Sequence, residues 1–430
     1  MSTDTCRQQG EAGSLSSKKE LTEGQTKEQT QKHTKEQTVT HMTTEQQMHS
    51  GREVSVRLAD MSAGYNGKAV VEHVSMDIYS GEIVALIGPN GAGKSTILKS
   101  IVRQLPLVGG SVYLKGKELK TYAYDELSKT LAVVLTDRIR PELMTCRDVV
   151  ASGRYPYTGR MGRLTEQDQV IVSDALHEVH AEEIADREFS RISDGQRQRI
   201  MLARALCQEP DVLVLDEPTS FLDIRYKLEF LSICRRMAKE RNITVILSLH
   251  EIDLAMKIAD RIICVGGDHQ VSAGRPEGIF SEEGIRRLFR LDTGSFDAAF
   301  GSMELPAPAG KPEVFVISAC GSGIPVYREL QRQGVPFAAG ILYTNDVDYR
   351  LARVLAAETV TAEPFTEISD ASLDKARQIM AGCGRVINAC DTFGPENQKL
   401  QILIEEARTA EKLEDRTDPD ITTDGRKNMD

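Results

Sequence analysis

Short runs of aliphatic residues alternate with segments of helical periodicity between about residues 52 and 300. The segment 81–105 predicts a buried strand, a glycine-rich turn and a helix. Two further runs predict buried strands: residues 211–218, where adjacent carboxylates follow the apolar run, and residues 243–250, which end in a histidine. Strands that alternate with helices are typical of a parallel sheet covered by helices. Because ligands collect at the carboxyl ends of the strands in such sheets, the three strand ends predict one shared site.

The same alternation returns on a smaller scale from residue 313 to about residue 410, where a strand, a glycine turn and a helix precede further strand–helix pairs. This pattern predicts a small, doubly wound Rossmann-like α/β unit with right-handed crossovers. Between the two blocks, residues 301–312 are rich in Pro, Gly and Ala and predict a linker.

Both ends of the chain are polar. Residues 1–50 almost lack aliphatic and aromatic side chains, and residues 411–430 have a similar composition. Such segments cannot bury enough apolar surface to offset their conformational entropy. We therefore expect two disordered tails.

Composition excludes some functions. The chain has 53 Lys and Arg against 64 Asp and Glu, a formal net charge of −11, which argues against a sequence-independent nucleic-acid binder. No apolar run approaches the roughly 20 residues that span a bilayer, and the N-terminus has no apolar signal core. Any membrane role therefore requires a partner. The eight Cys form no CxxC pair, which favours reduced, buried thiols in a cytosolic protein.

One motif carries phosphate chemistry. Residues 88–96 match the P-loop pattern G-x-x-x-x-G-K-S/T. Its glycines let backbone N–H groups wrap a phosphate, and the following helix directs its positive end at the same anion. Lys94 is expected to reach the β- and γ-phosphates, and the Ser95 hydroxyl to bind Mg²⁺. The predicted ATP-binding residues of this loop are Gly88, Pro89, Asn90, Gly91, Ala92, Gly93, Lys94, Ser95 and Thr96.

Two adjacent carboxylates, Asp216 and Glu217, follow the apolar run "VLVL". A carboxylate at a strand end beside a P-loop holds Mg²⁺ directly or through water, so Asp216 is the second expected metal ligand. Glu217 is placed to orient or deprotonate an attacking water. The expected cofactors are thus ATP and Mg²⁺.

With these motifs in this order, residues 52–300 resemble the ATP-binding cassette (ABC) ATPases. The resemblance rests on the Walker A stretch "GPNGAGKST", the signature-like "ISDGQRQRIMLARAL", the Walker B stretch "VLVLDEP", the D-loop-like "SFLD" and the histidine of "SLHEIDLA". It implies a P-loop NTPase domain with a helical subdomain. It also implies that Tyr65 stacks on adenine, that Asp223 is the D-loop acid, and that His250 contacts the γ-phosphate and positions the water.

The signature segment consists of Ser193, Asp194, Gly195 and Gln196, at the start of an expected helix. A helix N-terminus with small residues is typical of an anion site. In the family this segment faces the γ-phosphate held by the other subunit. The resemblance therefore implies a homodimer that two ATP molecules join.

Two positions depart from the family pattern. Thr136 stands where the family has a Gln that contacts Mg²⁺ and couples to the permease, and a hydroxyl has a shorter reach. Asp194 stands where the family has Gly. A carboxylate about 4 Å from a γ-phosphate would cost on the order of 4 kcal/mol at an effective dielectric of 20, against about 0.3–1 kcal/mol gained at a helix N-terminus. We therefore expect the Asp194 side chain to point away from the nucleotide.

Residues 144–159, "MTCRDVVASGRYPYTG", resemble the permease-docking segment of importers for iron–siderophore complexes, haem and cobalamin. This resemblance implies an integral membrane permease as partner, a substrate-binding protein as indirect partner, no nucleic acid, and a peripheral place at the cytoplasmic face of the cell membrane. The alternative is a soluble, non-transport ABC ATPase of Fe–S assembly, DNA repair or translation. The chain lacks the second cassette of translation-type members and the inserted coiled coils of repair-type members.

The second block offers a weaker signal. Gly321 and Gly323 supply two of the three glycines of a dinucleotide motif, and Val326 holds the third place. Three acids, Asp346, Asp348 and Asp391, follow expected strands at the binding edge, as does Thr392. Two interpretations stay open: a small-molecule sensing domain, and a packing or dimerisation module.

Overall fold

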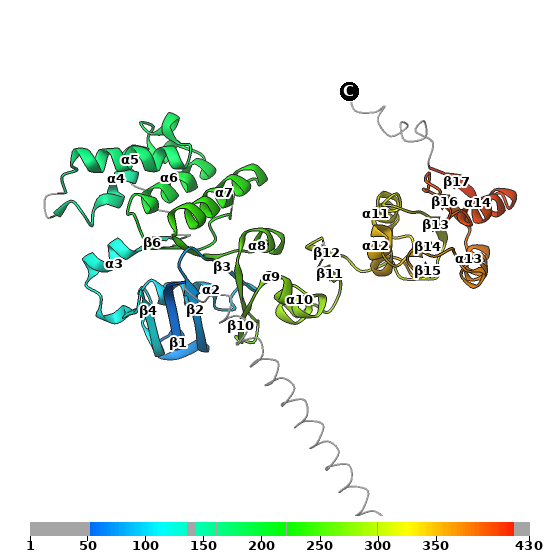
Figure 1. Cartoon of the computed structure of the whole chain (residues 1–430), viewed down its shortest axis with the longest axis horizontal. Helices are drawn as coiled ribbons and strands as arrows, with labels where there is room; N and C mark the ends of the chain where they lie inside the picture. Colours follow the sequence, from blue (N-terminus) through cyan, green and yellow to red (C-terminus); the bar gives the residue numbers. More distant parts are fainter. Residues whose placement is uncertain (1–51, 136–142, 160–161, 221, 299, 417–430) are drawn as a thin grey trace, which may run out of the picture.

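The computed structural model of the chain describes residues 52–135, 143–159, 162–220, 222–298 and 300–416. Two sheets of largely parallel strands organise these residues, and Figure 1 shows them in separate units along the chain. The tail predicted at 1–50, the residues from 417 onward and Thr136 lie outside the described residues.

The central sheet of the first unit has six strands. Their spatial order is β10 (Val271–Gly274), β9 (Arg261–Val265), β3 (Ile83–Ile87), β8 (Thr244–Ser248), β7 (Val212–Leu215) and β6 (Leu131–Val134). All neighbours from β9 to β6 are parallel, and β10 is antiparallel to β9. Strands β3, β7, β8 and β9 are buried along their whole length, because the sheet is covered on both faces. The three buried strands predicted from residues 81–105, 211–218 and 243–250 are confirmed.

One face of this sheet packs against an antiparallel sheet in the order β2 (Lys68–Tyr79), β1 (Val54–Tyr65), β4 (Leu107–Leu114) and β5 (Lys117–Glu118). Val84 and Leu86 of β3 join a hydrophobic core there with α2 (Lys94–Ile101) and the strands of the antiparallel sheet. The short helix α3 (Tyr124–Thr130) leads back to β6. The alternating residues of β3 thus separate two cores.

The other face of the central sheet carries the larger core, which Ile83, Ala85 and Ile87 enter from β3. The helices of this layer are α4 (Cys146–Ala151), α5 (Glu166–Glu178), α6 (Asp194–Leu206), α7 (Ile224–Arg241), α8 (Ile252–Ile258), α9 (Pro276–Ile279) and α10 (Glu282–Phe289). Helices α4, α5 and α6 each begin with a capping box, in which a Ser or Thr hydroxyl and a side chain three residues later satisfy free backbone N–H groups. These three helices pack together and form the helical subdomain (Figure 1).

A hairpin follows the first unit. Strand β11 (Ser295–Asp297) pairs antiparallel with β12 (Ser302–Glu304), and Phe296 is buried in the larger core. The linker predicted at 301–312 therefore begins later than expected, because its first residues complete this hairpin. The short strands lack their own apolar pattern, so their pairing was not visible in the sequence.

The second unit is a five-stranded parallel sheet in the order β15 (Glu358–Ala362), β14 (Phe337–Tyr343), β13 (Val314–Ile317), β16 (Arg385–Asn388) and β17 (Leu413–Asp415). Helices α11 (Ile324–Gln333), α12 (Val347–Leu355), α13 (Asp370–Gly382) and α14 (Leu400–Thr409) connect the strands. The Rossmann-like prediction is confirmed. The expectation of a disordered tail from residue 411 is wrong at its start, because β17 pairs with β16 and Arg416 forms an ion pair with Glu329.

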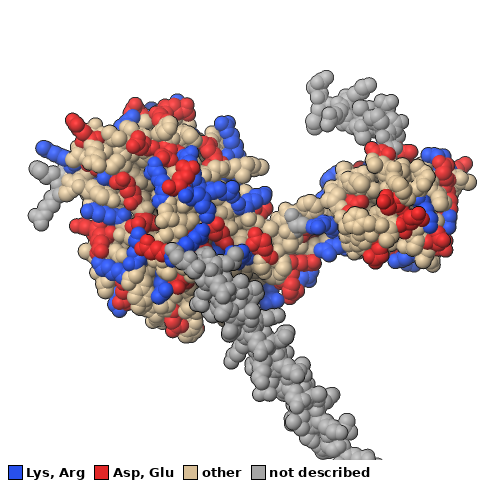
Figure 2. All heavy atoms as spheres, in the orientation of Figure 1, with Lys and Arg blue, Asp and Glu red and all other residues tan. Residues whose placement is uncertain are grey.

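No helix in the described part of the chain has the length and apolarity to cross a membrane. On the face seen in Figure 2, Lys and Arg side chains lie among Asp and Glu side chains over both units. Of the seven Cys in the described residues, six are buried, as expected, and Cys320 is exposed.

An ion pair joins the hairpin to the second unit. Glu304 of β12 is almost fully buried, with 2% of its side chain exposed, and both of its carboxylate oxygens accept hydrogen bonds from Arg328 of α11. Next to this pair, Gln331 Nε2 donates to the carbonyl of Leu305 at 3.2 Å. A second pair, Glu282 and Arg353 at 3.7 Å, is about half exposed on both sides. The buried pair is therefore the stronger tie between the units.

Replacing Glu304 with Gln tests this tie. The variant removes the charge that compensates Arg328, and because Arg328 is partly exposed we expect a loss of about 1–3 kcal/mol in the free energy of unfolding. Denaturant unfolding of the full chain measures it. The control is Arg353→Gln, which breaks the exposed pair and should cost less than about 1 kcal/mol. Equal effects of the two variants would show that the Glu304 pair has no special weight.

Candidate active site

The P-loop lies between β3 and α2, at the carboxyl edge of the central sheet. Gly88 and Gly93 adopt φ values of 156° and 122°. A Cβ on Gly88 would approach the Val265 carbonyl oxygen to 2.1 Å, and a Cβ on Gly93 would approach Val71 to 2.7 Å. These two positions therefore require glycine, whereas Gly91 has open space around it and needs glycine only for its φ of 79°.

Lys94 opens α2 and folds back over the loop. Its Nζ donates to the carbonyl oxygens of Gly88 at 2.7 Å and Pro89 at 3.1 Å. The residue is 5% exposed, and burial lowers the pKa of its ammonium group, although Glu217 and Asp216 oppose this shift. His269 also contacts the loop, and its Nδ1 lies 2.8 Å from the Ala92 carbonyl oxygen. His269 lies in the turn between β9 and β10, where no motif marked it in advance.

Asp216 follows β7 and faces the start of α2. Its Oδ1 accepts a hydrogen bond from the Ser95 hydroxyl at 3.2 Å, and the residue is 6% exposed. A serine hydroxyl and a carboxylate converging beside a phosphate loop supply the hard oxygen ligands that Mg²⁺ prefers. The residues present thus fit the expected metal, which Ser95 and Asp216 would hold together with the nucleotide phosphates.

Glu217 and His250 meet at the same edge. His250 Nε2 lies 2.9 Å from Glu217 Oε1, and both side chains are partly exposed. The Ser220 hydroxyl donates to Glu217 Oε2 at 3.3 Å. A carboxylate between a histidine and the metal-side aspartate has the reach to accept a proton from a water or to orient it. The predicted acid and histidine are therefore brought together.

Ser248, the last residue of β8, forms hydrogen bonds to both Asp216 and Glu217. It is fully buried, its hydroxyl donates to Asp216 Oδ1 at 2.8 Å, and its oxygen accepts the Glu217 N–H at 2.7 Å. Ser248 was not among the predicted site residues. The available signal was a single hydroxyl in the otherwise aliphatic end of the run "TVILSL".

The signature segment lies on the helical subdomain, where Ser193 is the N-cap of α6. Its hydroxyl accepts the Gln196 N–H at 3.3 Å, and Gln196 Oε1 accepts the Ser193 N–H at 3.1 Å. The Asp194 carboxylate accepts a hydrogen bond from Arg197 of its own helix at 2.9 Å. Arg197 therefore compensates the charge that departs from the family pattern.

Gly195 and Asp223 are linked through α7. A Cβ on Gly195 would approach the ring of Tyr226 to 3.0 Å, and the Asp223 carboxylate caps α7 by accepting the Tyr226 N–H at 3.0 Å. The D-loop acid thus sets the start of the helix against which the signature glycine packs. Tyr65 ends β1 and is 47% exposed, so its ring is accessible for stacking on a base.

The candidate edge of the second unit is occupied by its own carboxylates. Asp346 accepts the Cys320 N–H at 2.9 Å, and Asp348 accepts the Gly323 N–H at 3.0 Å. Asp348 is fully buried, and burial raises the pKa of its carboxyl group, which the Gly323 N–H opposes. Both amides of the glycine turn therefore donate to carboxylates of the unit itself.

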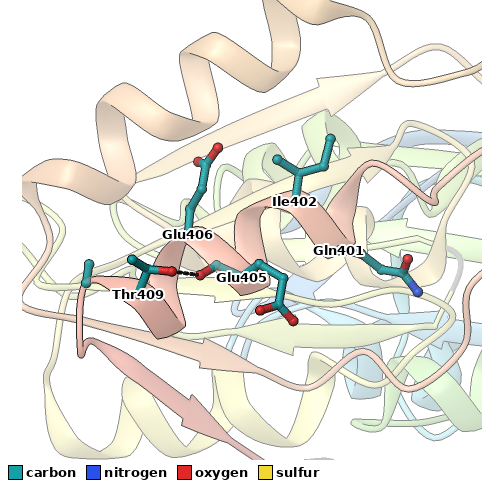
Figure 3. A pocket seen from close by; sticks show the side chains of 6 residues that line it. Gln401, Ile402, Glu405, Glu406 and Thr409 are labelled. Atoms are coloured by element: carbon teal, nitrogen blue, oxygen red, sulfur yellow. Dashed lines mark hydrogen bonds between the residues drawn. The ribbon is translucent and has the colours of Figure 1, made fainter.

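A shallow groove runs along α14 of the same unit (Figure 3). Ile402 is 40% exposed there, Thr409 donates to the Glu405 carbonyl oxygen at 2.8 Å, and Glu406 pairs with Arg377 of α13. The polar groups of Glu406 and Thr409 are thus satisfied within the unit. We assign no ligand to this groove.

The carboxyl edge of the central sheet joins the P-loop to two acids that follow β7 and to a histidine that contacts the second acid. The helical subdomain adds a signature helix capped by a serine. Together these features define a P-loop ATPase of the ABC type. The comparisons with known proteins agree with this class. The model of the ABC transporter family matches residues 71–220, and that of the MJ0874 family matches residues 337–424.

Three relatives and one solved structure extend the comparison. An uncharacterised ABC transporter ATP-binding protein of Methanocaldococcus jannaschii is 42% identical over 288 residues, 67% of this chain and 99% of that protein. The cobalamin import ATP-binding protein BtuD of Halobacterium salinarum is 31% identical over 329 residues, 75% of this chain and 82% of that protein. The achromobactin transport ATP-binding protein CbrD of Dickeya dadantii is 32% identical over 252 residues, 59% of this chain and 94% of that protein.

The solved structure is an ABC transporter described as of the metal-chelate type, in an inward-facing conformation. One of its chains is 24% identical with a TM-score of 0.50, and the match covers 58% of this chain and 95% of that one, which shows the fold alone. The relatives found by sequence also show the family, because one is 42% identical over 99% of its length. The chain belongs to the ABC transporter ATP-binding proteins, and it is an ATP-binding, ATP-hydrolysing enzyme of the ABC type.

Glu217→Gln tests the role of the second acid. The amide keeps the size and hydrogen bonding of the side chain but removes its basicity, so ATP hydrolysis should fall by roughly 10²- to 10⁴-fold. ATP binding, measured by the thermal shift with nucleotide, should survive. Ser220→Ala is the control, since it removes only a hydrogen bond to the same carboxylate. Hydrolysis by Glu217→Gln at the parental rate would assign the chemistry to another group.

Proposed function

We propose that the chain powers an importer for iron–siderophore complexes, or for the related haem or cobalamin complexes, through a separate membrane permease. The relatives named for cobalamin import and for achromobactin transport support this class of cargo. The chain would then be peripheral at the cytoplasmic face of the membrane. The cargo itself never contacts an ATPase subunit, so the proposal depends on the surface that meets the permease.

The observation that carries the proposal is the segment from α4 to residue 159. Arg154 is buried in the helical subdomain, where it binds Asp168 at 2.8 Å, Glu209 at 2.7 Å and the Cys207 carbonyl oxygen at 2.9 Å. Its guanidinium also lies 3.9 Å from the ring centroid of Tyr157. The neighbouring Tyr155 is 74% exposed.

This arrangement holds an aromatic side chain outward on a rigid base. Leu143, just before α4, is 91% exposed and adds a second apolar side chain. Exposed aromatic groups on a well-packed base are typical of the central contacts of protein interfaces. We therefore take Tyr155 as the centre of the permease contact.

The proposed catalytic cycle uses two copies of the chain. Lys94 and the P-loop amides bind the phosphates of one ATP, and Tyr65 stacks on its adenine. The signature residues Ser193 and Gln196 of the second copy close over the γ-phosphate. Glu217 then orients or deprotonates the attacking water while His250 holds Glu217 and contacts the γ-phosphate. Ser95 and Asp216 would hold Mg²⁺, which would supply positive charge to stabilise the phosphoryl group.

Mixing two inactive variants tests the shared site. Lys94→Ala removes the phosphate-binding ammonium, and Ser193→Arg blocks the signature face with a large side chain. Each homodimer should be inactive, whereas a mixed dimer keeps one intact site and should recover up to about half of the activity per dimer. Mixed dimers are first verified with two affinity tags. Verified mixed dimers that stay inactive would contradict a site shared between copies.

Uptake by whole cells tests the transport function. Cells that lack the gene should lose accumulation of one labelled cargo among iron–siderophore, haem and cobalamin, and the wild-type chain should restore it. Tyr155→Ala should reduce this restoration by roughly tenfold while the isolated chain keeps its basal ATPase rate. Phe365→Ala is the matched control, because Phe365 is an exposed aromatic residue of the second unit, 87% exposed.

Two outcomes would count against transport. Normal uptake of all three cargoes in cells without the gene would remove the proposal and favour a non-transport ABC ATPase. Full restoration of uptake by Tyr155→Ala would leave transport in place but move the permease contact elsewhere.

We propose that the second unit is an accessory domain that regulates the ATPase and takes no part in hydrolysis. The residues with proposed roles in hydrolysis all lie in the first unit. The hairpin sets where the units can be separated: a cut near Ser302 would remove β12 and expose the larger core around Phe296. A truncated chain should therefore keep residues up to about Leu305.

A further inference from the structure

A single buried hydroxyl links the two acids of the active site. Ser248 ends β8, which lies between the P-loop strand β3 and the acid-bearing strand β7. Its backbone is in register with Leu86, next to the P-loop, and the preceding Leu247 is in register with Leu215, next to Asp216. The register of the sheet therefore places the Ser248 side chain beside Asp216 and Glu217, the expected metal ligand and the acid that orients the water.

The direction of each hydrogen bond follows from the chemistry. An ionised carboxylate can only accept, so the Ser248 proton points to Asp216 Oδ1, at 2.8 Å. The Ser248 oxygen is then left to accept the backbone N–H of Glu217, at 2.7 Å. One side chain thus uses both its donor and its acceptor on two consecutive residues that have different tasks.

The Glu217 backbone needs such support. Its φ is 49°, in the left-handed region that residues with a Cβ rarely adopt. Residues in that region persist when surrounding contacts determine them, and they gather at active sites. The bond from the Glu217 N–H to Ser248 is one of these contacts, and in this conformation the Glu217 carboxylate reaches His250 at 2.9 Å.

The Asp216 carboxylate is also held by defined hydrogen bonds. Oδ1 accepts from Ser248 and from Ser95, the other expected metal ligand. The two hydroxyls hold this carboxylate between the end of β8 and the start of α2, so its orientation is set before a metal binds. We propose that Ser248 is a positioning residue for ATP hydrolysis, which orients Asp216 toward Mg²⁺ and Glu217 toward the attacking water at once. This inference rests on the roles proposed for those two acids.

The test compares three variants of the full chain. Ser248→Ala removes both hydrogen bonds. Ser248→Thr keeps the hydroxyl and suits a strand. Thr244→Val is the matched control, because Thr244 is a fully buried hydroxyl at the other end of β8, 3.4 Å from the Tyr79 carbonyl oxygen and away from the acids. Thermal unfolding without nucleotide identifies variants that fold, and Ser248→Cys, which keeps the volume but donates weakly, replaces Ser248→Ala should the latter be insoluble.

Two readouts distinguish positioning from packing. The first is the maximal ATPase rate, which should fall by roughly 10- to 100-fold in Ser248→Ala, as expected for loss of hydrogen bonds to a charged group. The second needs no hydrolysis: in the Glu217→Gln background, the Mg²⁺ concentration that gives half of the ATP-dependent thermal shift should rise by about 10-fold or more. Ser248→Thr should recover much of both, and Thr244→Val should change neither.

Ser248→Ala with a parental ATPase rate and an unchanged Mg²⁺ requirement would overturn the proposal. A lower unfolding temperature alone, with both readouts unchanged, would also overturn it, since Ser248 would then serve packing only. The roles of the two acids are judged separately by Glu217→Gln alone. An inactive Glu217→Gln beside a normal Ser248→Ala leaves the proposed function standing and removes only the positioning role.

Discussion

The parallel pairing of β3, β8 and β7 is the constraint on which the rest of the active site depends. Parallel neighbours end at the same edge, and the registers of these strands bring the P-loop, Ser248 and Asp216 to one line. The interior of the sheet is aliphatic on both faces, so a slip of one residue would move buried side chains into the wrong core. The hydrophobic pattern therefore determines the position of the catalytic groups as well as the fold.

Much of this edge could be predicted from the sequence because its signals are local. The P-loop is a contiguous motif, and the acids and His250 directly follow or lie near the ends of buried strands. Ser248 escaped prediction because its partners, Asp216 and Glu217, are 32 and 31 residues away. The same reason applies to the Glu304–Arg328 pair and to β17, which pairs with β16. The hairpin of β11 and β12 was missed because its strands are three residues long and have no apolar pattern of their own. The partner of Asp194 is close in sequence instead, because Arg197 lies one helical turn away on the same helix.

The two units bear different kinds of relation to other proteins. The relative from Methanocaldococcus jannaschii aligns over 99% of its length within 288 residues, so it has no room for both units of this chain. The family model that matches residues 337–424 is separate from the ABC model. The hairpin packs Phe296 into the core of the first unit, and its Glu304 pairs with Arg328 of the second unit. The junction between the units is therefore held by specific contacts.

The central claim is that one copy of the chain holds only half of a working ATP site. The dependence of the initial ATPase rate on chain concentration tests it most directly, at saturating ATP and Mg²⁺ and over concentrations from below to above the dissociation constant of the dimer. A site completed by a second copy predicts a rate that rises with the square of the concentration and becomes linear once dimers predominate. A rate linear in concentration over the whole range, in a chain shown to be monomeric by sedimentation at those concentrations, would contradict it.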